Sequence, residues 1–327
     1  MIVAPGEYRV PCTKYQGHGW PSDSVLAAWY SVLTMRPHFT WQLRSRTLEL
    51  GPRTLIMGVL NVTPDSFSDG GRFVEPRAAI EHGFKLLDDG ADILDIGGES
   101  TRPGAMAASG QPAVPAEEEL RRVMPVIEEL LRQRPEVVVS IDTYKAQVAR
   151  KAVEAGAEIT NDVSGLCWDA EMALTLAELK CGVVLMHMRG RPEEWRTLPP
   201  LRDPVGLVSR ELRRSAEAAV MAGIARQRIV LDPGFGFGKS FDENYPLLAH
   251  FDTLQELRYP LLAGVSRKSF IGRTLAKDGT DAPPQKRLYG SLAAMTAAIL
   301  KGAHIVRVHD VKAAVQAAKI ADAVLRG

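Results

Sequence analysis

Short apolar runs rich in β-branched residues alternate along the chain with longer stretches of helical period. Each run is predicted to form a buried strand, and the runs lie at residues 54–60, 93–96, 137–141, 159, 183–186, 229–231, 261–265 and 305–308. Eight buried strands, each followed by an amphipathic helix, indicate a parallel sheet that closes into an α/β fold of the (β/α)8 barrel (TIM barrel) type. An open doubly wound sheet is the alternative that this pattern leaves open.

Helix boundaries in this series carry recognisable signals. Pro76 suits a first helical turn, and Gly90 supplies a stop after the apolar positions of the same helix. The pattern Gly-Ala-x-Ile recurs at 90–93, 156–159 and 302–305, each time where a helix should turn into a strand. Three occurrences at equivalent places favour a repeated βα unit.

The beginning of the chain differs from the rest. Residues 1–34 contain several prolines and glycines with little periodicity, so we expect an ill-ordered N-terminal extension before a barrel domain at 35–327. Residues 40–50 alternate as a hairpin does, and such a hairpin would plug the N-terminal mouth of the barrel. Met35 is a candidate translation start, a hypothesis that N-terminal sequencing of the native protein would contradict by finding residues upstream of it.

Composition and charge narrow the function classes. The chain has 327 residues, of which 46% are hydrophobic and 24% charged, which is ordinary for a soluble globular protein. A formal net charge of +1 gives no support to a nucleic-acid or membrane partner, so small-molecule partners are expected. The three cysteines are widely spaced and no export or membrane segment is recognisable, so a cytoplasmic location is expected.

Polar residues follow the apolar runs, at the barrel end where active sites of this fold lie. They are Asn61, Glu99, Thr101, Arg102, Asp142, Asn161, Asp162, His187, Asp232, Lys268, Arg307 and His309. A solvated rim would also be polar, so the whole set carries the argument and no single residue decides it.

Within this set, Asp142, Asn161, Asp232 and Lys268 suit a planar heterocycle with donors and acceptors along its edge. The alternative is that the two aspartates form ion pairs with Lys or Arg of neighbouring strands. Arg307 and His309 alternate along the last strand and therefore point the same way. Together with Asn61 they suit an anion such as a diphosphate and its Mg²⁺.

The segment 232–240 invites a P-loop interpretation, but Pro233 stands where G-x-x-x-x-G-K-[ST] needs glycine. We therefore expect a flexible glycine-rich loop that lets Phe237 and Lys239 approach a bound ring. The sequence contains no G-x-S-x-G, H-E-x-x-H or C-x-x-C motif, so hydrolase-triad and zinc-enzyme interpretations lack support.

At these same positions the chain resembles the dihydropteroate synthase family over residues from about 54 to 325. Long matching strings carry the resemblance, and they lie at 57–71, 95–104, 140–143, 161–165, 185–188, 232–239, 266–270 and 307–311. The resemblance implies that 6-hydroxymethyl-7,8-dihydropterin diphosphate and 4-aminobenzoate combine to give 7,8-dihydropteroate and diphosphate, with Mg²⁺ as cofactor. It also implies a homodimer.

The resemblance assigns roles residue by residue. The pterin diphosphate would be bound by Thr101, Asp142, Asn161, Met186, Asp232, Phe237, Lys268, Arg307 and His309. The 4-aminobenzoate pocket would contain Phe67, Ser68, Thr101, Pro103 and Ser269, and Asn61 would bind the metal. Catalytic roles would fall to Asp69, Arg102, Lys268, Arg307 and His309.

Two alternatives remain from the sequence. A related pterin-binding methyltransferase could share the ring-binding carboxylates, although it should lack the strings at 100–104 and 266–270. An inactive pterin-binding paralogue would usually have lost site residues, and none is lost here.

Overall fold

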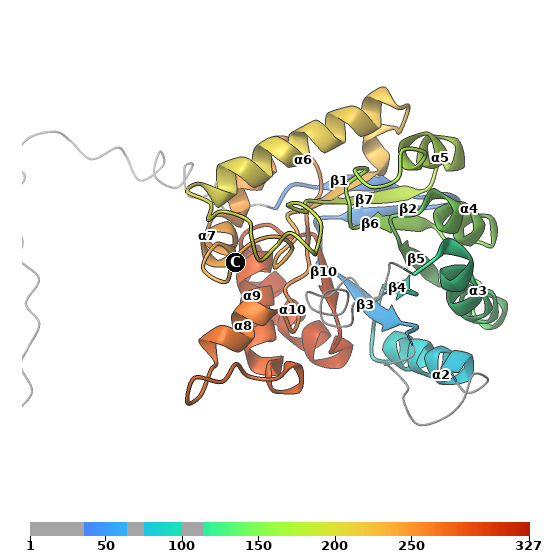
Figure 1. Ribbon diagram of the computed structural model, residues 1–327. Coiled ribbons are helices and arrows are strands. Elements are labelled where there is room, and N and C mark those ends of the chain that lie inside the picture. Colours follow the sequence, from blue (N-terminus) through green and yellow to red (C-terminus); the bar gives the residue numbers. More distant parts are fainter. Residues whose placement is uncertain (1–35, 64–74, 100–113) are drawn as a thin grey trace, which may run out of the picture. The chain divides into compact units, whose positions relative to one another are not determined.

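Eight parallel strands form one sheet that curves into a nearly closed barrel, as the sequence predicts (Figure 1). The structure is a computed structural model, and it describes residues 36–63, 75–99 and 114–327. The barrel strands are β3 (Leu55–Asn61), β4 (Ile93–Gly97), β5 (Val138–Asp142), β6 (Ile159–Asp162), β7 (Gly182–Met186), β8 (Ile229–Asp232), β9 (Leu262–Ala263) and β10 (Ile305–Val308). The sheet order is β8-β7-β6-β5-β4-β3-β10-β9, and a parallel bridge between Leu231 and Leu261 joins its two edges. The open doubly wound sheet is therefore excluded.

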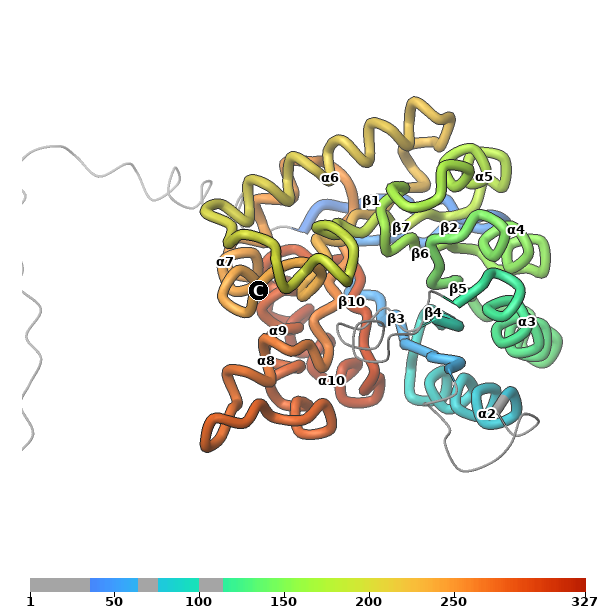
Figure 2. The backbone as a smooth tube through the Cα atoms, in the orientation of Figure 1, coloured from blue at the N-terminus to red at the C-terminus, as the bar shows by residue number. Residues whose placement is uncertain are grey.

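The chain runs around this barrel in sequence order, so that β10, near its end, lies beside β3 (Figure 2). The helices are α2 (Glu75–Asp88), α3 (Ala116–Gln133), α4 (Ala146–Glu154), α5 (Met172–Leu179), α6 (Pro204–Met221), α7 (Asn244–Ala249), α8 (Ser269–Thr274), α9 (Leu288–Leu300) and α10 (Val311–Arg326). Short 3-10 helices occupy Arg226–Arg228, Phe251–Leu257 and Pro284–Lys286. The helices cover the outside of the sheet, and one large apolar cluster joins them to the outward-facing strand residues.

The alternation of inward- and outward-facing side chains along each strand determines which residues fill the barrel. Successive side chains of a strand point to opposite faces. One face of β4, β5 and β6 therefore places Ile93, Val138 and Ile159 in a fully apolar interior cluster at the N-terminal ends of the strands. Two residues further along β4 and β5, the same inward face carries Asp95 and Ser140. The barrel thus has an apolar floor and a polar upper layer.

A hairpin closes the floor from below, as the alternation at 40–50 predicts. Strands β1 (Phe39–Gln42) and β2 (Thr47–Leu50) pair antiparallel, and Trp41 is fully buried in the interior cluster with Leu43 and Leu50. The indole Nε1 donates to the carbonyl of Arg228 at 2.8 Å, so this buried donor is satisfied. The predicted extension at 1–34 lies outside the described residues.

A buried histidine ties the hairpin to the barrel. His304 is fully buried, its Nε2 lies 2.8 Å from the Pro37 carbonyl, and its Nδ1 lies 3.1 Å from the amide nitrogen of Leu261. Since Nδ1 accepts from that amide, Nε2 carries the proton and donates. His304 therefore has the structural packing role that its place at a strand entry suggests.

The repeated Gly-Ala dipeptide marks equivalent helix ends. Gly90, Gly156 and Gly302 have φ of +103°, +116° and +99°, and each lies between a helix and the next strand. In every case the amide of the following alanine bonds to a carbonyl five residues earlier at 3.0 Å. This is the hydrogen bond that closes a helix end with a left-handed residue, so the repeated βα unit is confirmed.

Two strands differ from their predicted ranges by more than one residue at an end, and the others agree to within one residue. β6 extends beyond Ile159 to Asp162, because Asn161 and Asp162 interrupt the apolar pattern without interrupting the ladder. β9 is shorter than the predicted 261–265, since the chain leaves the sheet at Gly264. Among the helices of the described ranges, none is long and apolar enough to cross a membrane.

Candidate active site

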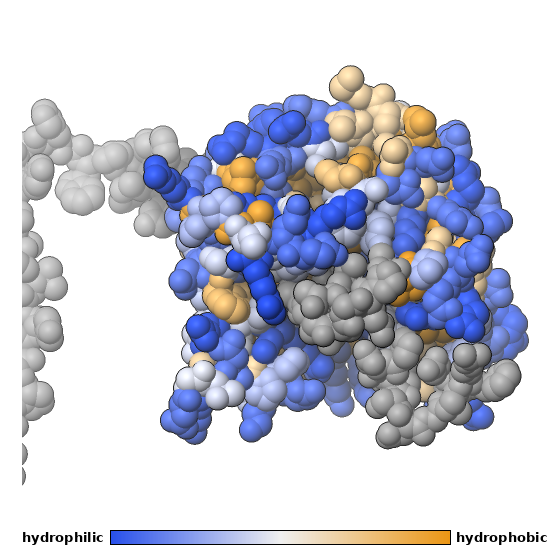
Figure 3. Space-filling model, viewed as in Figure 1, coloured by the Kyte–Doolittle hydropathy of each residue, from blue (hydrophilic) through white to orange (hydrophobic). Residues whose placement is uncertain are grey.

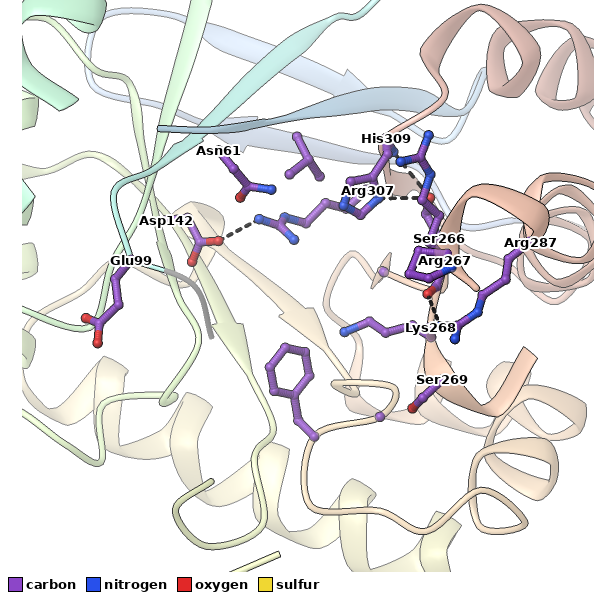
Figure 4. A pocket seen from close by; sticks show the side chains of 15 residues that line it. Asn61, Glu99, Asp142, Ser266, Arg267, Lys268, Ser269, Arg287, Arg307 and His309 are labelled. Atoms are coloured by element: carbon purple, nitrogen blue, oxygen red, sulfur yellow. Dashed lines mark hydrogen bonds and ion pairs between the residues drawn. The ribbon is translucent and has the colours of Figure 1, made fainter. Parts of the chain in front are cut away.

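A cavity of about 310 Å³ opens at the carboxyl ends of the strands. Its walls include Asn61, Glu99, Asp142, Phe237, Ser266, Arg267, Lys268, Ser269, Arg287, Arg307 and His309 (Figure 4). The rim residues of β3, β5 and β10 therefore converge as predicted. Figure 4 shows Arg307 and Lys268 reaching from one wall toward Asp142 on the opposite wall.

Arg307 lies between two carboxylates. Its Nε donates to Oδ2 of Asp95 at 2.6 Å, and its Nη2 donates to Oδ2 of Asp142 at 2.5 Å. These charges raise the pKa of Arg307 above its ordinary value, despite the opposing effect of its burial. The ion pair that the sequence left as an alternative for Asp142 therefore exists, and it joins two predicted ligand-binding residues to each other.

Asp142 is largely buried in the cavity wall. It is 8% exposed, and its Oδ1 is a buried oxygen without a hydrogen-bond partner in the described structure. Burial raises the pKa of Asp142 to about 7, although Arg307 and Lys268 act in the opposite direction. A buried acceptor of this kind is suited to an N–H donor of a ligand.

Asp95 is a site residue that the sequence reasoning missed. It is fully buried in the middle of β4 and accepts hydrogen bonds from Ser140 Oγ at 2.6 Å, Asn161 Nδ2 at 3.0 Å and Arg307 Nε at 2.6 Å. The sequence does contain an indication of this role. Asp95 interrupts an apolar run two residues after Ile93, and side chains two residues apart in a strand share one face, here the inward face. Asp95 connects two of the residues predicted to bind the ring.

Lys268 lies over an aromatic ring from the neighbouring loop. Its Nζ is 3.8 Å from the ring centroid of Phe237, a cation–π arrangement. Phe237 meets Trp195 edge to face at 5.7 Å and shares a small apolar cluster with Val163 and Met186. Phe237 therefore lines the cavity, while Met186 supports that ring from a buried position.

The loop that carries Phe237 is held by internal hydrogen bonds. Gly234 has φ +65°, and a Cβ there would lie 2.0 Å from the His187 carbonyl oxygen, so glycine is required. Lys239 does not reach the ring slot, contrary to the prediction. Its buried Nζ instead donates to the carbonyls of Gly234 at 2.7 Å and Phe237 at 3.1 Å. Burial lowers the pKa of Lys239 to about 7.

Asn161 and Asp232 adjoin the cavity without forming its surface. Asp232 is buried, its Oδ1 accepts the Gly234 amide at 2.7 Å, and burial raises its pKa against the opposing charges of Lys268 and Arg307. Asn161 is 3% exposed, and its Nδ2 donates to Asp95. The structure thus brings Asp232 near Lys268 and Arg307, and it joins Asn161 to Arg307 through their shared partner Asp95.

The segment before α8 is fixed by long-range contacts. Arg267 has a left-handed backbone, φ +58°, and its guanidinium donates to both carboxylate oxygens of Asp310 at 2.9 and 2.6 Å. Its amide donates to Ser291 Oγ at 2.8 Å, and Arg287 Nη1 donates to its carbonyl at 2.8 Å. Such strain persists where surrounding contacts enforce it. These contacts position the next residue, Lys268, over the cavity.

Two further wall residues have defined partners. His309 approaches Ser266 Oγ through its Nδ1 at 3.1 Å and its amide nitrogen at 3.2 Å, which orients the imidazole. Glu99, 8% exposed, pairs with Lys145 Nζ at 2.5 Å. Lys145 also contacts the buried Glu119. The sequence prediction named neither Lys145, which directly precedes α4, nor Glu119, which lies inside α3.

Some predicted rim residues point elsewhere. Asp162 accepts the amides of Ser164 at 2.8 Å and Leu166 at 2.7 Å within its own turn. His187 pairs through Nε2 with Glu211 at 2.8 Å, and burial lowers the pKa of His187 to about 4. Neither residue belongs to the cavity walls. Both therefore have structural roles.

Several assignments concern residues that the structure does not describe. Phe67, Ser68, Asp69, Thr101, Arg102 and Pro103 lie outside the described ranges. Within those ranges, no group of three or more His, Cys, Asp or Glu side chains is placed to hold a metal ion. Asn61, the predicted metal ligand, lies at the end of β3 in the cavity wall.

Comparison with known proteins agrees with this geometry. The family model of pterin binding enzymes matches residues 57–309. A dihydropteroate synthase of Synechocystis is 44% identical over 276 residues, which cover 84% of this chain and 92% of the relative.

Solved structures give the same result. The dihydropteroate synthase of Xanthomonas albilineans with 4-aminobenzoic acid has a TM-score of 0.79 at 47% identity, covering 88% of this chain and 98% of that one. The same enzyme with 7,8-dihydropteroate has a TM-score of 0.75 at 44% identity, covering 87% and 98%. With a polar cavity at the carboxyl ends of a (β/α)8 barrel and relatives of this similarity, the chain belongs to the dihydropteroate synthase family of pterin-binding enzymes.

Proposed function

We propose that the chain joins 6-hydroxymethyl-7,8-dihydropterin diphosphate to 4-aminobenzoate, forming 7,8-dihydropteroate and releasing diphosphate. The main support for this function is the position of Arg307, which lines the same cavity as Lys268 and His309. Its guanidinium donates hydrogen bonds to Asp95 and Asp142. Cationic groups thus lie beside buried carboxylates, which suits an anionic leaving group on an N–H-rich ring. The solved relatives with 4-aminobenzoic acid and with 7,8-dihydropteroate support both ends of this reaction.

The pterin ring is assigned to the polar upper layer of the barrel. Asp142 and Asp232 are buried acceptors suited to ring N–H groups, and Asn161 offers an amide already oriented by Asp95. Lys268 suits an acceptor atom of the ring, and Phe237 beneath it suits the flat face. Met186 belongs to the same buried apolar cluster as Phe237. These contacts bind and orient the ring without covalent chemistry.

The diphosphate is assigned to Arg307 and His309, with Arg102 from outside the described ranges. Arg307 is fixed by its two carboxylates, so little reorganisation accompanies the build-up of negative charge on the leaving group. Ser266 fixes His309 in the same way. The aminobenzoate is assigned to Ser269 at the start of α8, with Phe67, Ser68, Thr101 and Pro103.

Mg²⁺ is proposed as the cofactor, with Asn61 as its protein ligand. A single amide oxygen in the cavity wall fits a metal that usually keeps several waters and binds substrate phosphates. When bound, the ion would neutralise charge on the departing diphosphate.

The chemistry asked of the protein is electrostatic. Loss of diphosphate leaves a cation delocalised over the pterin ring, which Asp142 and Asp232 stabilise by their negative charge. The aniline nitrogen attacks the methylene carbon through its own lone pair and loses its proton afterwards, so no dedicated general base is required. Asp69, outside the described ranges, is assigned to ordering its own loop against the developing cation.

Turnover of defined substrates tests this function. Purified protein is mixed with the pterin diphosphate, radiolabelled 4-aminobenzoate and Mg²⁺, and labelled dihydropteroate is expected. A methyltransferase or an inactive paralogue would give none, and that result would end the proposal. Omitting Mg²⁺ or adding a chelator should abolish product, and undiminished turnover would remove the metal from the mechanism.

The site assignment has its own test. Lys268→Ala should raise the KM for the pterin diphosphate, because it removes the ammonium over Phe237. Cys167→Ser is the control, since that exposed thiol lies outside the cavity walls. Equal effects of the two substitutions would contradict the assignment.

We also propose a homodimer formed through α9 and α10. No charged residue occurs between Leu288 and Leu300, yet Tyr289 is 82% and Leu300 42% exposed. On the adjacent α10, Ile320 and Val324 are 69% and 64% exposed. A surface helix without charges favours a protein partner.

Light scattering on charged variants tests the dimer. Ile320→Glu combined with Val324→Glu should yield a monomer. Figure 3 shows apolar residues gathered over the end of α6, where Met221 is 88% exposed. Met221→Glu is therefore the matched control and should remain dimeric. A monomeric parent protein, or dissociation by the control alone, would contradict the proposed interface.

A cytoplasmic location completes the proposal. Cys167 and Cys181, the cysteines that the structure describes, are both free thiols, which agrees with a reducing compartment. Cell fractionation followed by immunodetection tests this location, and recovery outside the cytoplasmic fraction would contradict it.

A further inference from the structure

The polar layer of the barrel is organised around one buried carboxylate that does not border the cavity. Asp95 is fully buried in β4, between the apolar floor and the cavity. It accepts hydrogen bonds from Asn161, Arg307 and Ser140. Donors from three other strands, β6, β10 and β5, therefore meet on Asp95. We propose that Asp95 is the positioning residue of the pterin site, acting through Asn161 and Arg307 without touching the substrate.

The contact with Asn161 decides how that amide faces a ligand. One hydrogen of Nδ2 is directed to Asp95 Oδ2 at 3.0 Å, which fixes the amide plane and distinguishes its nitrogen from its oxygen. The Oδ1 of Asn161 is consequently directed away from Asp95. A neutral partner at position 95 could donate as well as accept, and the amide of Asn161 could then turn over. The carboxylate, which only accepts, gives Asn161 a single orientation.

The contact with Arg307 acts at the same time. Nε of Arg307 meets the same Oδ2 of Asp95 at 2.6 Å, while Nη2 meets Asp142. Two carboxylates thus fix both ends of the guanidinium plane. Loss of one leaves Arg307 attached through Asp142 alone, and the guanidinium can rotate about that contact. Because Asp95 Oδ2 serves both Asn161 and Arg307, a change at Asp95 disturbs ring and diphosphate groups together.

Ser140 supplies an internal control. Its Oγ donates to the other oxygen of Asp95, Oδ1, at 2.6 Å, and Ser140 is fully buried. It contacts the same carboxylate but belongs to neither group of substrate-binding residues. Ser140→Ala therefore removes a hydrogen bond from Asp95 while leaving Asn161 and Arg307 in place. If Asp95 served only to stabilise the barrel, Asp95→Asn and Ser140→Ala would act alike.

Calorimetry with 6-hydroxymethylpterin, a ring without diphosphate, tests the proposal directly. Asp95→Asn is expected to weaken ring binding on the order of 10- to 100-fold, because misorientation of positioned groups has effects of this size. The KM for the pterin diphosphate should rise similarly, while the KM for 4-aminobenzoate stays within about twofold. Ser140→Ala should leave ring binding within about twofold of the parent protein. A purely structural role would lower the melting temperature without separating the two KM values.

Several outcomes would overturn the proposal. Ring binding by Asp95→Asn equal to that of Ser140→Ala would do so, as would an equal rise in both KM values. If Asp95→Asn does not fold, a double variant that carries both Asp95→Asn and Asn161→Asp is measured. It again places one amide and one carboxylate at these two positions. In this double variant a carboxylate, and no longer an amide, stands at position 161 beside the ring. Normal ring affinity of the double variant would therefore also overturn the proposal. The inference rests on the proposed function, but ring binding is measured without turnover, so failure of the synthase assay alone remains distinguishable.

Discussion

The ammonium of Lys268 lies 3.8 Å from the ring centroid of Phe237, so the cationic group and the aromatic side chain of the cavity wall hold each other in position. Phe237→Ala removes this cation–π contact and the flat surface proposed for the pterin. The expected loss is about 1.5–3 kcal/mol of ring binding, or roughly 10- to 100-fold in the KM for the pterin diphosphate. Steady-state kinetics measures it.

Phe241 provides the matched control for that substitution. Its ring lies near Arg273, at 5.4 Å, in a similar cation–π arrangement outside the main cavity. Phe241→Ala should change the same KM by less than about threefold. A comparable loss in both variants would mean that the effect comes from general disturbance of the loop.

The pH dependence of pterin binding should report Asp142. Burial raises the pKa of Asp142 to about 7, and the carboxylate is the form that accepts a ring N–H. Because the acid form predominates below that pKa, kcat/KM for the pterin diphosphate should fall as pH decreases through about 7, approaching tenfold per unit. Asp142→Asn should lower kcat/KM and remove this acid limb. Asp252→Asn, an exposed partner of Lys301, should retain it. If kcat/KM of Asp142→Asn still falls with decreasing pH through about 7, the titrating group is not Asp142.

The hairpin and the catalytic cavity should be separable by mutation. Trp41 is fully buried below the barrel floor and donates to the Arg228 carbonyl, far along the strands from the cavity. Trp41→Ala should lower the free energy of unfolding by about 3–5 kcal/mol through the cavity that it leaves. Leu48 lies on the same hairpin but is only half-buried, so Leu48→Ala should lower the free energy of unfolding by about 1 kcal/mol or less. Denaturant titration measures both, and the KM values of folded Trp41→Ala should stay unchanged. Altered KM values would show that the floor and the site are coupled.

The fold followed from the sequence because its signals are local. Apolar runs, helix-stop glycines such as Gly90 and the alternating hairpin each depend on near neighbours, and all three are confirmed. The convergence of Asp142 with Arg307 also followed, since parallel strands bring their carboxyl ends together.

The parts of the site that the sequence did not predict depend on contacts between residues far apart along the chain. Asp95 receives Arg307 across 212 positions of sequence, and nothing near Asp95 indicates its partner. Arg267 and Asp310, 43 positions apart, fix Lys268 through a strained backbone that no periodicity reveals. The glycine-rich composition of the loop predicts a flexible segment that lets Lys239 approach a ring, but the Lys239 Nζ instead donates to carbonyls of that same loop.

Buried His304 should make the stability of the protein sensitive to acid. Its imidazole contacts the Pro37 carbonyl and the Leu261 amide, and burial lowers the pKa of His304 to about 4, from 6.5. The unfolded chain therefore binds a proton between pH 6.5 and 4 that the folded protein excludes. Stability from this group is complete above pH 6.5 and declines as pH falls, by about 3 kcal/mol at pH 4. His304→Gln should lose this dependence, while His250→Gln, at the exposed end of α7, should keep it. Unfolding by denaturant at several pH values distinguishes them, and an unchanged slope in His304→Gln would remove His304 as the cause.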